Sequence, residues 1–330
     1  MKTNGLVMCA VIALIAWIVP LYGDQIPGNV IATGSIAKGA ATDSPAAQKN
    51  TSWQCPRTSW GHPDLQGIWT NFDRTPFERP QPANSAPRRN TGAAGVGPSP
   101  DFSQDWAHVR LSPVRPSVVV DPLNGRVPVR PEAEARRDYD LARITDSWEY
   151  QSPWERCITR GVPGGMFPSD YNNAVRIFQT PDSFIIFQEM IHETRIIPVD
   201  GRPHLPSNVP QWMGDSRGHW EGDTLVVETT HFDDRAWIAN NNATGRMKGI
   251  HSTADLRVVE RFIRVNANTI NWQATIEDPK VYTSPWTVAM PLNLELDYKM
   301  FEYACHEGNH AMPNTLSAGR AEDAAAAKTK

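Results

Sequence analysis

Apolar and polar residues alternate along much of the chain from residue 173 onward, and this alternation predicts antiparallel strands. The clearest case is 269–277, where every second residue is apolar (Ile270, Trp272, Ala274, Ile276) and the residues between are polar. Asn124-Gly125 favours a tight turn joining strands 117–120 and 126–129 into a hairpin. The other predicted strands lie at 67–69, 175–179, 184–197, 224–230, 256–265, 286–294 and 299–305.

One segment has the features of a helix. Pro131 suits a first helical position, and Glu132 and Glu134 suit the first turn, so we predict a helix over 131–145. The chain also contains 28 Pro and 22 Gly, many of them in a long loop at 78–104. This pattern predicts a mainly β protein, an antiparallel barrel or twisted sandwich with one helix and long Pro-rich loops.

The ends of the chain differ from this β-rich part. Residues 1–23 combine Lys2, a continuous apolar run and a small residue at Gly23, which predicts a signal peptide and a periplasmic or secreted protein. The run is too short for a membrane span, so we expect no membrane association once it is removed. We interpret 24–54 as a flexible lead-in, 55–322 as one β-rich domain and 323–330 as a disordered tail.

The cysteines outside the leader are odd in number. Cys55, Cys157 and Cys305 remain, so an oxidising compartment leaves one disulfide and one free thiol. We predict the pair Cys157–Cys305, because each lies beside well-patterned sequence whereas Cys55 ends a polar segment.

Net charge argues against one class of partner. Asp and Glu outnumber Lys and Arg by 36 to 32, so the chain lacks the basic excess that phosphate binding needs, and we expect no nucleic-acid partner.

The predicted strand 184–197 carries ionisable residues among apolar ones. Strand periodicity places His192 on the face of Phe184 and Ile186, and Arg195 on the opposite face. His192 is therefore a candidate general base in a barrel pocket, and Arg195 a candidate anion clamp. The alternative is a core histidine and a structural Glu–Arg pair.

A second candidate segment is 211–220, which is dense in polar groups between Trp212 and Trp220. Asp215 is predicted to orient His192, and Arg217 to hold a substrate carboxylate. Trp212 is a candidate substrate-binding residue beside them. An internal Asp–Arg salt bridge, with Trp212 and Trp220 as packing anchors, is an equally good interpretation.

Residues 306–310 spell His-Glu-x-x-His, the letters of a zinc protease motif. That motif needs a helix, but Gly308 and Asn309 are poor helix formers and a predicted strand precedes them. We therefore expect no metal here and consider His306 and Glu307 as acid/base groups, or as part of a polar loop.

Four further polar residues are candidates for a pocket. Glu260 lies in an apolar strand, where a carboxylate needs a partner or a raised pKa. Tyr171 and Asn172 suit a pocket rim or a loop cap, and Asn309 follows Glu307 in the C-terminal candidate segment.

Four blocks of the sequence resemble a large group of exported bacterial proteins of unassigned function. These are PDLQGIWT (63–70), EMIHETR (189–195), QWMGDSRGHWEGD (211–223) and YACHEGN (303–309). The resemblance implies export but no reaction. Gly67-Ile68-Trp69 also resembles the Gly-x-Trp opening of lipocalin-like barrels, which implies a lipocalin-like fold.

Ionisable residues in apolar strands are costly unless they are paired or used. We therefore expect an exported, cofactor-independent enzyme that uses acid/base catalysis on a small, partly apolar molecule, as a hydrolase, lyase or isomerase. His192, Asp215, Arg217 and His306 would then converge on one cavity. The alternative is a lipocalin-like carrier of a hydrophobic ligand, suggested by the 12 Trp residues.

Overall fold

The computed structural model describes residues 53–81, 113–169 and 171–328. All of these belong to one compact unit, Ser44–Lys330. The predicted leader, nearly all of the lead-in and most of the 78–104 loop lie outside the described residues. No helix among the described residues is long and apolar enough to cross a bilayer.

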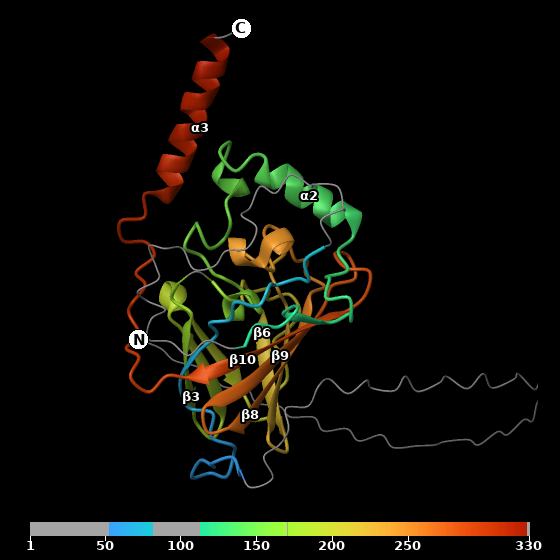
Figure 1. The fold of residues 1–330 in the computed structure, drawn as a ribbon, viewed down its shortest axis with the longest axis vertical. Helices are drawn as coiled ribbons and strands as arrows, with labels where there is room; N and C mark the ends of the chain where they lie inside the picture. The colour runs from blue at the N-terminus through green and yellow to red at the C-terminus, as the bar shows by residue number, and fades with distance from the viewer. Residues whose placement is uncertain (1–52, 82–112, 170, 329–330) are drawn as a thin grey trace, which may run out of the picture. The chain divides into compact units, whose positions relative to one another are not determined.

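Ten antiparallel strands form a nearly closed barrel, which confirms the mainly β prediction (Figure 1). Their order is β5-β4-β3-β1-β10-β9-β8-β7-β6, with β2 paired to β10 outside this path. The strands are β1 (Gly67–Thr70), β2 (Val119–Asp121), β3 (Ala174–Gln179), β4 (Ser183–Gln188), β5 (Thr194–Pro198), β6 (Asp215–Glu221), β7 (Thr224–Thr230), β8 (Arg257–Asn266), β9 (Thr269–Glu277) and β10 (Trp286–Leu294).

Strand β9 shows why the apolar alternation produces this barrel. Its four apolar residues, from Ile270 to Ile276, have no exposed surface, whereas the residues between them are partly exposed. Trp272 is opposite Phe262 of β8 and Met290 of β10, so large side chains from three neighbouring strands meet on the inner face. Burial of this face supplies the main driving force for the fold.

The two end strands of the sheet, β5 and β6, come together through side chains. Arg195 Nε on β5 donates a hydrogen bond of 3.0 Å to Ser216 Oγ on β6. Gly218 permits the close approach, because a Cβ there would lie 2.9 Å from Val199 Cγ1 and 3.2 Å from Ile197 Cγ2. A larger residue at this position would push the strands apart.

A charged pair is buried inside the barrel at this closure. Arg195 and Glu260 are joined by a 2.5 Å contact, and their side chains are 4% and 0% exposed. Trp272 Nε1 donates to Glu260 Oε1 (3.1 Å), and Arg195 also donates to Thr229 Oγ1 (2.7 Å). The pair therefore links β5, β7, β8 and β9 from within the barrel. Arg195 thus has the structural role in a Glu–Arg pair that was the alternative to an anion clamp.

The predicted strand 184–197 is wrong as one element. A single 3-10 turn, Met190–His192, divides it into β4 and β5, and Ile191 and His192 adopt left-handed φ values of 65° and 44°. His192 therefore does not share the inner face of Phe184. The interruption lies next to Glu189, whose buried carboxylate accepts hydrogen bonds from Tyr298 Oη and the Phe301 backbone N–H.

Other local expectations also changed. The 117–129 segment is not a hairpin, because β2 pairs with β10 instead, and 299–305 is not a strand. Helix α2 (Pro131–Leu141) begins where predicted but is shorter. Helix α3 (Ala311–Lys328) includes most of the segment that was expected to be a disordered tail.

The predicted disulfide is confirmed. Cys157 and Cys305 are bonded, with a Cα–Cα separation of 5.6 Å and a sequence separation of 148, and Cys55 is free. The bond joins the largely buried segment 151–169 to the chain that leads into α3.

We predict that Glu260→Gln lowers the free energy of unfolding by about 3–5 kcal/mol, because it leaves the buried Arg195 charge without its partner. Urea denaturation at pH 7 measures this loss. Arg261→Gln is the matched control on the same strand, because Arg261 pairs with Glu221 at the exposed face, and we expect it to change stability very little. Equal effects of the two substitutions would contradict the role given to the buried pair.

Candidate functional site

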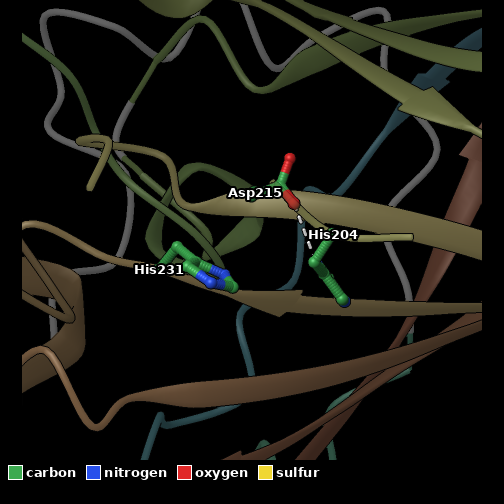
Figure 2. A group of neighbouring side chains, drawn as sticks. All are labelled: His204, Asp215 and His231. Carbon is green, nitrogen blue, oxygen red and sulfur yellow. Dashed lines mark hydrogen bonds and ion pairs between the residues drawn. The ribbon is translucent and has the colours of Figure 1, made fainter. Parts of the chain in front are cut away.

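Two histidines and an aspartate meet at one end of the β6–β7 hairpin. Asp215 is the first residue of β6 and lies opposite Thr230, the last residue of β7, so His231 follows directly beside it. His204 comes from the 199–214 segment between β5 and β6. Figure 2 shows the three side chains next to one another, with a carboxylate oxygen of Asp215 turned toward the ring of His204.

Asp215 is the most constrained member of the cluster. Its Oδ2 accepts hydrogen bonds from His204 Nδ1 (2.8 Å) and the Leu205 backbone N–H (2.9 Å), and its Oδ1 accepts one from Arg217 (2.6 Å). Burial acts to raise the pKa of Asp215, but these three donors outweigh it and lower the pKa below its ordinary value. The carboxylate is therefore ionised at neutral pH.

His204 lies between two carboxylates. Its Nδ1 contacts Asp215, while its Nε2 is 3.7 Å from Glu228 Oε2 and makes no hydrogen bond within the described structure. The ring of His231 is next to it, with 5.6 Å between ring centroids.

His231 has its own constraints. Its Nδ1 lies 2.7 Å from Thr230 Oγ1, and its backbone has a left-handed φ of 58°. Non-glycine residues in this region cost about 1–3 kcal/mol and concentrate at functional sites.

The cluster can support two kinds of chemistry. An imidazole oriented by a buried carboxylate is an effective proton acceptor or donor. Ligand atoms of His204, Asp215 and His231 also lie within 4.8 Å of one another, close enough to be considered as ligands of one metal ion. The same contacts hold the 199–214 segment on the barrel, together with a 2.7 Å hydrogen bond from Arg217 Nε to the Pro203 carbonyl.

The structure divides the residues singled out in the sequence among three places. Asp215 is in the cluster and Arg217 donates a hydrogen bond to its carboxylate, whereas Trp212 lies just before them, packed under the Arg235 guanidinium at 4.8 Å. Arg195 and Glu260 form the pair inside the barrel. The remaining candidates lie toward the C-terminal segment, so the residues do not converge on one cavity.

The C-terminal candidates surround an open hollow of about 690 Å³. Tyr171, Glu307 and Asn309 line it, together with Tyr303, whose ring stacks on Tyr171 at 6.2 Å. Asn309 is held by a hydrogen bond from its Nδ2 to the Glu155 carbonyl (3.2 Å).

The other C-terminal candidates are near this hollow or in adjoining turns. His192 Nδ1 lies 2.8 Å from the Tyr303 carbonyl oxygen, so His192 is held at the C-terminal segment. The histidine that contacts Asp215 is His204 instead. His306 is in the turn before α3, which begins only at Ala311, so His306 and His310 do not share a helical face. Asn172 has a φ of 51° in the turn that leads into β3.

Sequence analysis missed His204, His231 and Glu228. The turn at Gly222-Asp223 could have revealed His231, since counting outward along the two strands pairs Asp215 with Thr230. His204 has no such signal, because it lies in a segment without regular secondary structure.

We predict that Asp215→Asn lowers the free energy of unfolding at pH 7 by about 1.5–3 kcal/mol, the range for hydrogen bonds to a charged group. Because the folded-state pKa of Asp215 is depressed, this contribution is present above the ordinary pKa of about 3.9 and is lost as the pH falls below it. The difference between the two proteins should therefore shrink in acid, as measured by urea denaturation from pH 7 to pH 3. Asp200→Asn is the control in the same segment, with an exposed carboxylate paired to Arg202; an equal loss there would refute the prediction.

No protein-family model, no curated protein and no solved structure matches this chain.

Proposed function

We propose that the protein is an exported enzyme that uses acid/base catalysis on a small, partly apolar organic molecule, as a hydrolase, lyase or isomerase. The reaction is assigned to the cluster of His204, Asp215 and His231. The observation that carries the proposal is the 2.8 Å contact between His204 Nδ1 and the buried Asp215 carboxylate.

The role expected for Asp215 is kept, but its histidine partner is His204 instead of His192. A carboxylate that holds one ring nitrogen fixes the orientation and tautomer of the imidazole and stabilises its protonated form. His231 supplies a second imidazole at 5.6 Å, so one ring can accept a proton while the other donates one.

Export is supported by the confirmed disulfide. Disulfides persist in oxidising compartments and are rare in the cytosol, and the Cys157–Cys305 bond is present. Together with the leader-like pattern of residues 1–23, this favours a periplasmic or secreted enzyme.

The alternative, a lipocalin-like carrier, has less support. Gly67-Ile68-Trp69 does open a barrel strand, but the inner side chains Trp69, Trp272 and Phe262 have no exposed surface, so there is no water-sized space beside them. The Arg195–Glu260 charges also make this interior unsuited to a hydrophobic ligand.

We predict that His204→Gln lowers kcat by about 10²–10⁴-fold, the usual contribution of a general acid or base, and leaves the fold intact. The measurement is product formation by mass spectrometry across a panel of esters, lactones and hydroxy acids, followed by kinetics on any converted compound. Circular dichroism checks folding.

His219→Gln and His192→Gln are the controls. His219 is an exposed histidine on the same strand as Asp215, and His192 is exposed near the C-terminal hollow. Full activity in both, with loss only in His204→Gln, supports the cluster. Loss in His192→Gln with activity retained in His204→Gln would return the reaction to the C-terminal candidates.

A further inference from the structure

We propose that His204, Asp215 and His231 bind a divalent first-row transition-metal ion. The proposal concerns the cluster of the proposed function but goes beyond it, because it makes the two imidazoles ligands instead of acid/base groups. Metal binding itself can be tested without any substrate.

The first support is the spacing of the three side chains. Bonds from zinc to histidine or carboxylate ligands measure about 2.0–2.2 Å, so two ligand atoms of one ion are at most about 4.4 Å apart. The ligand atoms of His204, Asp215 and His231 all lie within 4.8 Å of one another. Small side-chain rotations are enough to bring them around one ion.

The second support is the partner of each remaining ring nitrogen. Metal-bound histidines almost always use their other nitrogen in a hydrogen bond that fixes the ring. His231 has such a partner in Thr230 Oγ1, 2.7 Å from its Nδ1. His204 Nε2 makes no hydrogen bond, but it faces Glu228 Oε2 at 3.7 Å, a carboxylate oxygen that can accept its proton. This assignment leaves His231 Nε2 and His204 Nδ1 for the ion.

The third support is the environment of His204 Nε2. If neutral His204 donates from Nδ1 to Asp215, the lone pair of its Nε2 faces the Glu228 carboxylate, and this buried atom has no hydrogen-bond partner. If Nδ1 instead binds a cation, Nε2 carries the proton and faces a hydrogen-bond acceptor. His204 Nδ1 and Asp215 Oδ2, which lie 2.8 Å apart, are then two neighbouring ligand atoms of one ion.

Asp215 is also held in the way that ligating carboxylates usually are. Arg217 binds its Oδ1 and the Leu205 N–H binds its Oδ2, which fixes the carboxylate plane. Glu228 is held on its other oxygen by Arg257 at 2.5 Å, so it too is preorganised beside His204.

The donor set indicates the class of ion. Two imidazoles and one carboxylate suit Zn²⁺, Fe²⁺ and related ions, not Ca²⁺ or Mg²⁺, which prefer oxygen ligands. Three protein ligands leave a coordination position open, as in catalytic metal sites. This inference replaces the expectation of a cofactor-independent enzyme, because an ion on Nδ1 gives His204 the role of a ligand.

The test uses the protein stripped with a chelator and titrated with Zn²⁺ by isothermal titration calorimetry, and with Co²⁺ by visible absorption. We expect one ion per chain and a Co²⁺ d–d spectrum typical of nitrogen and oxygen ligands. His204→Gln and His231→Gln should each weaken Zn²⁺ binding by at least about 100-fold. Thr230→Val keeps all three ligands but removes the partner of His231, and should weaken binding by about 10–100-fold.

Two variants control for general histidine and threonine effects. His219→Gln removes an exposed histidine of β6, and Thr224→Val alters the opposite end of β7; both should bind Zn²⁺ normally. Absence of one-to-one binding, or binding that survives both His204→Gln and His231→Gln, overturns the proposal. If the two histidine variants fail to fold, Thr230→Val decides: Zn²⁺ affinity equal to that of the parent overturns it.

The metal proposal and the proposed function fail in different ways. If turnover depends on His204 but persists after metal removal, and the protein does not bind Zn²⁺, the acid/base enzyme is supported and the metal site is ruled out. If the protein binds one Zn²⁺ per chain but converts no compound, the metal site is supported and the acid/base enzyme is ruled out.

Discussion

Closure of the barrel depends on a pair of opposite charges buried where the two ends of the sheet meet. Arg195 on β5 contacts Ser216 of β6, Thr229 of β7 and Glu260 of β8, so one guanidinium spans the gap that backbone hydrogen bonds leave. Desolvating both charges is expensive and is offset only by close geometry and full hydrogen bonding. Through these contacts the guanidinium holds β5 beside β6, β7 and β8.

The position of the candidate site follows from that closure. The 199–214 segment leaves β5 and enters β6, so the approach of these strands sets where both of its ends lie. Asp215, at the start of β6, then holds the segment through His204 and the Leu205 backbone. The two faces of β6 therefore serve different contacts. Ser216 binds Arg195 of the buried pair, whereas Asp215 binds His204 and Arg217 on the other face.

The sequence predicted those parts of the fold that depend on local patterns. Strand β9 could be recognised because one face is fully buried, and the Cys157–Cys305 bond because few cysteines are present. The break at Met190–His192 could not be recognised, because it is tied to contacts of Glu189 with Tyr298 and Phe301, more than a hundred residues away. Asp215 was identified as a residue that orients a histidine, but its partner depends on how an irregular segment folds over a hairpin, which no periodicity encodes.

The disulfide encloses every strand from β3 to β10, because these lie between Cys157 and Cys305. A protease that cuts once anywhere in this stretch produces two pieces that stay covalently attached until the bond is reduced. A nicked molecule can thus keep its barrel strands at high effective concentration and reassociate instead of losing half of its sheet. Such tolerance of a single cut would extend the lifetime of the folded protein wherever it meets a protease.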